Sequence, residues 1–297
     1  LDHALAAEVS WRELLPDAGG AWPPPRSGAA AVTLSDGRLL LFGGEAEDGT
    51  MADLWQLRLR SSGTAEWKQL SHSPSADWPE GGTGYVAVAL ADDSVLMLQK
   101  LRTLWRLVLE ANDEPQWERM SDHTSDDWPW PSWWRLDSEP VVTSLGDSAL
   151  VYSVAIRSTW VFTVNQNSWE ELHPVGEWPA DSSWHRIDTG VALPDGGLLV
   201  FVGEFAWKLT PPSGGVASSW AYLGSTRAPK SIKYTFNRRR YVVDAQIVGL
   251  PDGSTVFSEC ESWQFIPNLD NNLTGHRWEN LTAEDRLGGF KAHSAWW

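Results

Sequence analysis

The sequence predicts an all-β fold assembled from repeated four-stranded units, and three observations lead to this prediction. Tryptophan recurs with one period along the chain, turn sequences recur between apolar runs, and those runs have the length of strands. The chain of 297 residues contains 21 tryptophans but only 5 tyrosines and 8 phenylalanines. Such an excess of one residue type needs a structural cause, which a repeat would supply.

The tryptophans fall into three interleaved sets with one spacing of about 50 residues. The first set opens a Trp-x-x-Leu/Met pattern and consists of Trp11, Trp67, Trp117, Trp169, Trp220 and Trp278. The second set precedes the first in each repeat and consists of Trp55, Trp105, Trp160, Trp207 and Trp263. The third set is followed by proline and consists of Trp22, Trp78, Trp128 and Trp178. Three sets that share a period indicate one repeating unit.

Each unit is expected to contain four short strands. In the first unit the apolar runs predict strands at 28–34, 38–44, 53–59 and 66–70. Asp36-Gly37 separates the first two, and this dipeptide favours a hairpin because both residues tolerate positive φ. Equivalent turns follow at 92–93, 146–147, 194–196 and 251–253. The second strands are continuously apolar, as expected of strands covered on both faces.

Four-stranded antiparallel sheets repeated around an axis form a β-propeller, and a unit of about 50 residues fits the kelch repeat. Leu41-Phe-Gly-Gly44 matches the kelch double glycine, Asp53-Leu-Trp55 the aromatic third strand, and Trp67 the fourth-strand tryptophan. The sequence therefore resembles the kelch-repeat β-propeller family over essentially its whole length. The repeats are degenerate, since only the first unit keeps the double glycine. The resemblance implies an architecture and leaves the biochemistry open.

We expect a single propeller domain over residues 1–297, with blades that end near residues 70, 120, 172, 223 and 281. A fourth-strand pattern at the start and a first-strand pattern at the end predict a last blade shared between 1–14 and 282–297. Closure by the two terminal segments would remove the open sheet edge. This count predicts six blades, with seven as the alternative.

Composition excludes several classes of protein. The 23 basic and 39 acidic side chains give a net charge of −16, which argues against nucleic acid as a partner. No run of 18 apolar residues occurs, so no transmembrane helix is expected. Cys260 is the single cysteine, which forbids an intrachain disulfide and a cysteine zinc cluster. Lack of disulfides favours a cytoplasmic location, although sequons at Asn272 and Asn280 would permit glycosylation of a secreted chain.

Titratable residues offer two candidate sites. His72, His123 and His173 follow their repeat tryptophans at similar distances, but equivalent positions on a rim diverge, so exposed loop histidines are expected. Asp137, Asp188 and Asp244 lie at the start of three successive innermost strands and would border the central channel. They could hold a cation there, but acceptance of backbone N–H bonds in the turns is the favoured interpretation. No metal or cofactor is expected.

Aromatic residues gather in the loops that cross from one blade to the next. The tryptophans that precede proline lie in these loops, which also carry Trp130, Trp133, Trp134 and Trp184. Packing of indole against proline within the core is favoured for them. Exposure of several on one face would instead form a binding surface.

A basic segment stands out in this acidic chain. Residues 205–243 contain no acidic side chain and seven basic ones, so the remainder carries −16 − 7 = −23. Basic and aromatic residues alternate in its crossing loop, namely Arg227, Lys230, Lys233, Tyr234, Phe236, Arg238, Arg239 and Arg240. The loop would suit an acidic segment of a protein partner. Pairing with acidic loops of the same chain at Asp122, Asp126 and Asp127 is the equal alternative.

No nucleophile elbow, phosphate loop or His-Glu-x-x-His motif occurs in the sequence. We therefore expect a non-catalytic scaffold that binds a protein partner through its loop face, as a subunit of a larger assembly. The alternative is a carbohydrate-binding or sugar-processing propeller enzyme, because tryptophan faces suit sugar rings and kelch-like propellers include such enzymes.

Overall fold

The computed structural model describes residues 21–60, 64–70, 78–99, 102–122, 124–126, 128–129, 140–153, 158–176, 189–202 and 205–225, and four strands between 246 and 280. Its strands form five four-stranded sheets and one two-stranded hairpin. One turn of 3-10 helix, Val164–Gln166, interrupts the strands of this described part. No helix among these residues has the length and apolar character needed to cross a membrane.

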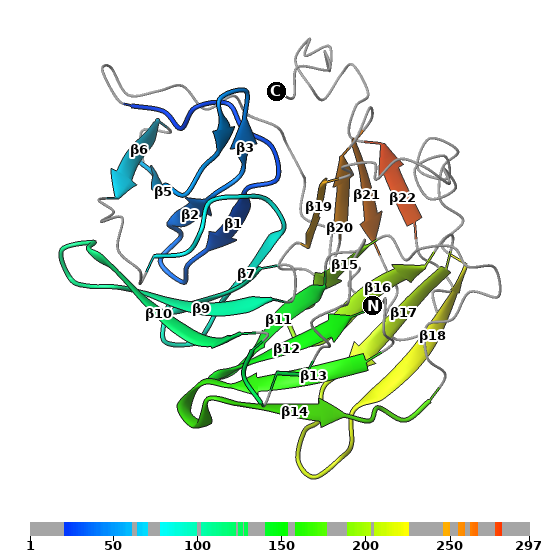
Figure 1. The fold of residues 1–297 in the computed structure, drawn as a ribbon. Helices are drawn as coiled ribbons and strands as arrows, with labels where there is room; N and C mark the ends of the chain where they lie inside the picture. The colour runs from blue at the N-terminus through cyan, green and yellow to red at the C-terminus, as the bar shows by residue number, and fades with distance from the viewer. Residues whose placement is uncertain are drawn as a thin grey trace. The chain divides into compact units, whose positions relative to one another are not determined.

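Each four-stranded sheet is formed by strands that follow one another along the chain (Figure 1). Sheet 1 contains β1 (Ala30–Thr33), β2 (Leu39–Phe42), β5 (Leu54–Leu59) and β6 (Ala65–Leu70). Sheet 2 contains β7 (Tyr85–Ala89), β8 (Val95–Gln99), β9 (Thr103–Leu109) and β10 (Pro115–Asp122). Sheet 3 contains β11 (Val141–Leu145), β12 (Ser148–Ser153), β13 (Ser158–Thr163) and β14 (Ser168–Leu172).

The later part of the chain repeats this order. Sheet 4 contains β15 (Thr189–Ala192), β16 (Leu198–Val202), β17 (Phe205–Thr210) and β18 (Ser219–Ser225). Sheet 5 contains β19 (Gln246–Gly249), β20 (Thr255–Ser258), β21 (Ser262–Ile266) and β22 (Arg277–Asn280). Neighbouring strands of sheets 1, 2, 4 and 5 are antiparallel. The predicted all-β fold of repeated four-stranded units is confirmed.

The chain forms two compact units. The first contains sheets 1 and 2 and most of sheet 3, and there β1 lies beside β7 and β7 beside β11. The second contains sheets 4 and 5, and there β15 lies beside β19. Within each unit, successive sheets therefore meet through their first strands, as blades of a propeller do. Ring closure and the number of blades stay predictions, since the terminal segments 1–14 and 282–297 lie outside the described residues.

Sheets 1 and 2 share one hydrophobic core. Phe42 of β2 lies with its ring centre 5.1 Å from that of Tyr85 on β7 and 5.2 Å from that of Trp117 on β10. Trp105 of β9 is 5% exposed and meets Trp117 edge to face. Large aromatic rings from both sheets thus fill the space between them, where each buried ring contributes several kcal/mol, about 3–5.

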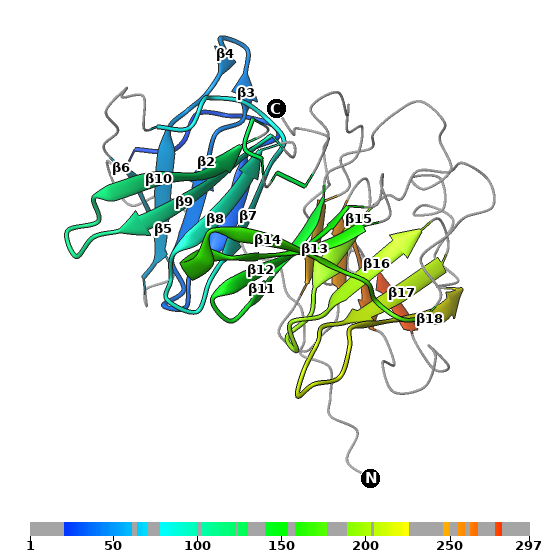
Figure 2. The ribbon, with the colours of Figure 1, turned by 60° about the horizontal axis from the view of Figure 1, so that its bottom comes forward.

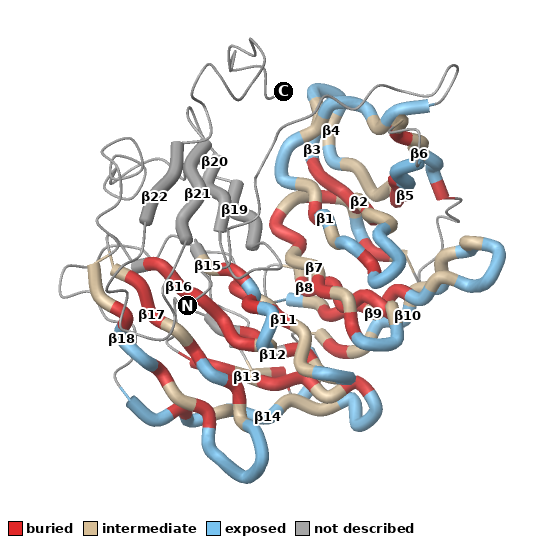
Figure 3. Tube along the Cα trace, turned by 180° about the vertical axis from the view of Figure 1, so that it is seen from behind, coloured by how far each residue is buried: buried red, intermediate tan, exposed pale blue. Residues whose placement is uncertain are grey.

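Buried residues follow the middle strands of the sheets (Figure 3). In β16, four consecutive residues from Leu198 to Phe201 are each no more than 1% exposed. A strand with both faces buried must be covered on both sides, which explains why these strands are continuously apolar rather than alternating. Sheet 1 differs from the other four-stranded sheets in one respect. The hairpin of β3 (Glu45–Ala46) and β4 (Gly49–Thr50) is inserted between its strands β2 and β5 and projects from it (Figure 2).

Candidate functional site

The site residues predicted from the sequence lie outside the described part of the chain. These are Arg227, Lys230, Lys233, Tyr234, Phe236, Arg238, Arg239, Arg240, Trp130, Trp133, Trp134, Trp184, Asp137, Asp188 and Asp244. His72 and His123 lie outside it as well, whereas His173 is exposed, as expected of a loop histidine. The partner-binding loop and the channel-mouth aspartates therefore stay predictions.

Three tryptophans that precede proline are described, and each packs on the fourth-strand tryptophan of the sheet that follows it. The ring centres of Trp22 and Trp67 lie 6.2 Å apart. Those of Trp78 and Trp117 lie 5.5 Å apart, and those of Trp128 and Trp169 lie 5.8 Å apart, both pairs edge to face. One recurring pair thus links each of these three described segments to the outer strand of the sheet that follows it.

This pairing decides between the two interpretations of two of these loop tryptophans. Trp128 is only 9% exposed, and the indole N–H of Trp78 donates a hydrogen bond to the carbonyl of Ala52 at 2.7 Å. Both side chains hold the loops in place, so core packing is the correct interpretation for them. Trp22 differs, because 42% of its surface stays exposed in the same kind of pair.

A buried ion pair anchors the entrance to sheet 1. Both terminal nitrogens of Arg26 donate to the carboxylate of Asp53, and Nη1 also donates to the Gly43 carbonyl at 3.0 Å. The indole N–H of Trp55 donates to the same carboxylate. Burial raises the pKa of Asp53, but the hydrogen bonds from Arg26 and Trp55 outweigh it, so the pKa lies below its ordinary value. The carboxylate is fixed in its charged form by structural partners.

The double glycine of the first repeat is required by close packing. Gly43 and Gly44 have φ of 72° and 96°, a region that glycine adopts without strain. The N–H of Gly44 donates to the carbonyl of Gly82 in the next crossing loop at 2.9 Å. A side chain on Gly43 would place its Cβ 2.8 Å from the same carbonyl oxygen. The motif therefore lets this crossing loop lie directly against the end of β2.

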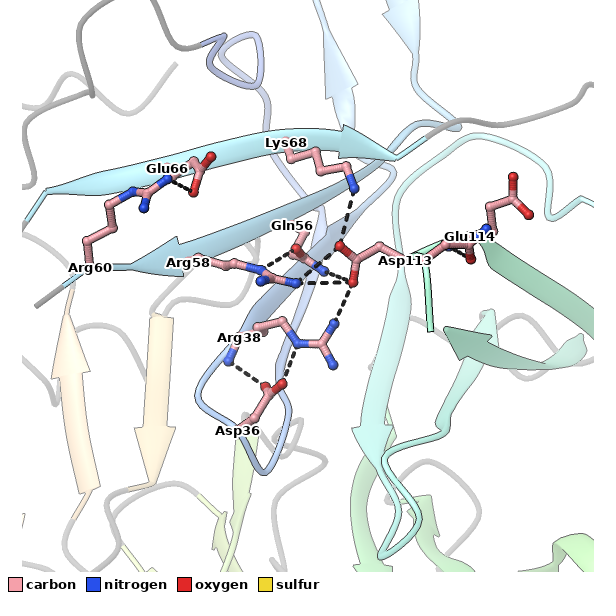
Figure 4. A network of polar contacts seen from close by, with 10 residues as sticks. Asp36, Arg38, Gln56, Arg58, Arg60, Glu66, Lys68, Asp113 and Glu114 are labelled. Carbon is pink, nitrogen blue, oxygen red and sulfur yellow. Dashed lines mark hydrogen bonds and ion pairs between the residues drawn. The ribbon is translucent and has the colours of Figure 1, made fainter. Parts of the chain in front are cut away.

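A polar cluster of the first unit centres on Asp113, in the turn between β9 and β10 (Figure 4). Its carboxylate accepts hydrogen bonds from Arg38 at 3.0 Å, Arg58 at 3.1 Å and Lys68 at 3.2 Å. A longer bond of 3.4 Å comes from the side-chain amide of Gln56, which is 1% exposed. Gln56, Arg58 and Lys68 lie on strands of sheet 1, and Arg38 directly precedes its strand β2. A turn of sheet 2 is therefore held by the neighbouring sheet.

Strand alternation explains why these donors converge. Gln56 and Arg58 are two residues apart on β5 and share one face, and Lys68 lies opposite Gln56 in the register of β5 and β6. The same face carries Leu54 and Phe42 nearer the crossing loops. The interface between sheets 1 and 2 thus changes from aromatic at one end to charged at the other.

The charge environment keeps Asp113 ionised. Burial raises the pKa of its carboxyl, but the hydrogen bonds from Lys68 and Gln56 and the charge of Arg58 lower it by more. The pKa of Asp113 consequently lies below the ordinary value for aspartate. Such a carboxylate is a poor general acid or base near neutral pH.

Asp93 makes a second tie between the same two sheets. Its carboxylate accepts the backbone N–H of Ser35 at 2.8 Å and the Ser35 hydroxyl at 2.7 Å, which joins the first hairpin turns of sheets 1 and 2. The backbone N–H of Ala91 donates to the carbonyl of Gly146 in the corresponding turn of sheet 3, at 3.4 Å. Equivalent turns of three successive sheets are therefore connected in series.

Both bridging aspartates have left-handed backbone conformations. Asp93 has φ of 61° and Asp113 has φ of 64°, at a turn position where Gly37 and Gly196 stand in other hairpins. Aspartate tolerates this conformation less well than glycine. The carboxylate that each one places on sheet 1 offsets that cost. This signal can be read in a sequence, as an aspartate at the glycine position of a hairpin turn.

Other hairpin aspartates tie strands within one sheet. Asp92 accepts from Arg106 at 2.9 Å, and Asp195 accepts from Lys208 at 2.7 Å. Arg106 and Lys208 each follow the third-strand tryptophan of their repeat. Lys208, which the charge analysis counted in the basic segment, is therefore occupied by a partner in its own sheet.

The described charged clusters hold turns and sheets together, and none has the arrangement of a catalytic centre. Among the described residues, no group of three or more His, Cys, Asp or Glu side chains could hold a metal ion. The gap between sheets 1 and 2 is lined by apolar residues such as Val32 and Met97 and is about the size of one water molecule.

Comparison with known proteins finds likeness in structure but not in sequence families. No protein-family model and no curated protein matches the chain. A solved streptogramin B lyase structure is similar, at 11% sequence identity and a TM-score of 0.44, over 87% of this chain and 70% of that one.

Proposed function

We propose that the protein is a non-catalytic interaction scaffold of the kelch-like propeller type, and that its loop face binds an acidic segment of a protein partner. The single observation that carries this proposal is the separation of charge along the sequence. Six basic side chains lie between residues 227 and 240 of a chain whose net charge is −16. An exposed basic loop on an acidic body would attract an acidic partner and orient its approach.

The described contacts support the scaffold interpretation in two ways. The carboxylates of Asp53 and Asp113 bind basic side chains of the same chain, so these clusters stabilise the fold. Binding residues are commonly carried by the loops of such a rigid framework. Asp122, one of the acidic residues considered as an internal partner of the basic loop, is bound by Arg119 at 2.7 Å and by Thr124. Its carboxylate is therefore already engaged.

Binding of a defined acidic probe tests the proposal. A poly-glutamate peptide should bind the whole chain at low salt and weaken as salt rises, whereas poly-glutamine of equal length should not bind. Replacement of Arg238, Arg239 and Arg240 by alanine should weaken poly-glutamate binding by about tenfold or more, with an unchanged unfolding midpoint.

A matched triple variant separates the loop from net charge. Arg60, Lys100 and Arg102 lie outside the basic segment, and their replacement by alanine removes the same three charges. This control should change binding by less than about twofold. Equal losses in the two triple variants would show that only overall charge matters, and the proposal would be wrong.

A further inference from the structure

Residues 22–26 read Trp-Pro-Pro-Pro-Arg and lie ahead of β1, with Trp22, Pro24 and Pro25 exposed. Proline fixes φ near −65° at three consecutive positions, and a residue that precedes proline is restricted to extended conformations. Residues 22–24 each precede a proline, so covalent geometry alone favours a polyproline II conformation here. The three prolines also lack an N–H, so this segment cannot extend a sheet.

Both ends of the segment are anchored to sheet 1. At one end the ring of Trp22 packs on Trp67 of β6, with ring centres 6.2 Å apart. At the other end the side chain of Arg26 is 5% exposed and binds Asp53 and the Gly43 carbonyl. Two fixed ends hold the prolines between them in place, and a segment ordered in advance loses less entropy on binding.

The middle of the segment faces solvent. Pro24 and Pro25 are exposed, and Trp22 keeps 42% of its surface exposed. A polyproline II helix has three residues per turn, so Trp22 and Pro25 lie on one ridge. The segment thus presents an apolar ridge whose prolines have no N–H donors, and the hydrogen bond recorded to its carbonyls comes from Arg26 Nε to Pro24, at 3.1 Å.

The corresponding loops of the next two repeats do not share these properties. The second has the single proline Pro79 after its tryptophan, and in the third Pro129 and Pro131 are separated by a tryptophan, so neither has a continuous proline run. Their tryptophans are less exposed than Trp22, since Trp78 is partly buried and Trp128 is only 9% exposed. The first repeat therefore keeps the structural pair and adds an exposed proline run to it.

We propose that residues 22–25 are a docking segment for a domain that recognises polyproline II helices through an aromatic groove. Such grooves stack aromatic rings on proline rings and donate hydrogen bonds to backbone carbonyls of the bound segment. Both features are complementary to an exposed, N–H-free ridge. This inference rests on the proposed scaffold function and names one class of partner for a segment outside the basic part of the sequence.

The test uses the whole chain and a panel of purified SH3, WW and EVH1 domains. Isotope-labelled domains are titrated with the protein, and at least one should show saturable shifts at its aromatic groove residues. The double variant Pro24→Ala, Pro25→Ala should weaken this binding by about tenfold or more. Pro212→Ala, a proline in the second unit, is the control and should leave binding unchanged.

Separate outcomes distinguish this inference from the scaffold proposal. Replacement of Arg238, Arg239 and Arg240 should not affect binding to the panel. Failure of every panel domain to bind the wild-type chain, or equal binding by the double proline variant, overturns the docking segment. Either result leaves the poly-glutamate test of the basic loop intact. Unfolding midpoints of all variants show that the fold is retained.

Discussion

Asp113 and Asp195 are both turn aspartates with basic partners, yet they do different work. Asp113 of sheet 2 binds Arg38, Arg58 and Lys68 of sheet 1, whereas Asp195 binds Lys208 of its own sheet 4. The first contact joins two sheets and the second joins two strands. An ion pair of a turn aspartate can therefore join two sheets or stabilise a single sheet. Which of the two it does depends on whether the basic residue lies on the neighbouring sheet or on the same sheet.

The largest effect is expected from the third-strand tryptophans. Trp105→Ala and Trp207→Ala should each lower the free energy of unfolding by about 3–5 kcal/mol, because both rings are 5% exposed. The ring contacts of Trp105 include Trp117, which reaches Phe42 of sheet 1, whereas Trp207 contacts Phe205 and Tyr222 of its own sheet. Denaturant unfolding measures the loss.

Hydrogen exchange then shows how far each tryptophan acts. Trp105→Ala should reduce the protection of amides in sheet 1 as well as sheet 2, while Trp207→Ala should act on sheet 4. Undiminished protection of sheet 1 in the Trp105 variant would contradict the shared core.

An intermediate effect is expected from the two aspartates. Asp113→Asn should lower the free energy of unfolding by about 1–3 kcal/mol, since it weakens charged bonds to several donors of another sheet. Asp195→Asn should cost about 0–1 kcal/mol, because the Asp195 carboxylate is 49% exposed and has a single cation. Equal losses of unfolding free energy in the two variants would show that the contact between sheets stabilises the protein no more than a contact within one sheet.

Glycine variants separate the carboxylate from the backbone. Asn167 also has a left-handed conformation, with φ of 47°, and Asn167→Gly should be neutral or stabilise by up to about 1 kcal/mol. Asp113→Gly relieves the same backbone cost and should still destabilise. If Asp113→Gly does not destabilise the protein, the hydrogen bonds to sheet 1 do not explain why aspartate occupies this turn position.

The smallest effect is the pH dependence. The pKa of Asp113 is lowered in the folded chain, so its contribution is complete above the unfolded-state pKa of about 3.9. The contribution is lost as pH falls towards the lower folded-state pKa, where the folded chain takes up the proton. Thermal unfolding from pH 6 to pH 3 should show a shallower acid decline in Asp113→Asn. Identical slopes would contradict this assignment.

Much of the fold could be predicted because its signals are local. Strands expected at 53–59 and 66–70 are observed at Leu54–Leu59 and Ala65–Leu70, since periodic tryptophans and turn residues mark the boundaries. The tie between Asp113 and sheet 1 was missed. It depends on how two sheets face each other across 75 residues of sequence from Arg38, which a local pattern does not encode.

The site was less predictable than the fold for a related reason. The exposure of Trp78 and Trp22 depends on the tryptophan that each one packs against and on the chain around that pair. Both residues precede proline in the same kind of loop. Residue type placed them correctly in crossing loops. It could not state that Trp78 is partly buried and Trp22 exposed.

The serial connection of hairpin turns constrains how this chain can evolve. Ser35 meets Asp93, and Ala91 meets Gly146, so each junction uses a different pair of groups. A duplicated blade inserted between the first two would need an acceptor for Ser35 on one flank and a donor for Asp93 on the other. Because each junction uses a different pair of groups, the first repeats cannot exchange places without losing these hydrogen bonds. A change in their order would require substitutions on both sides of each new junction.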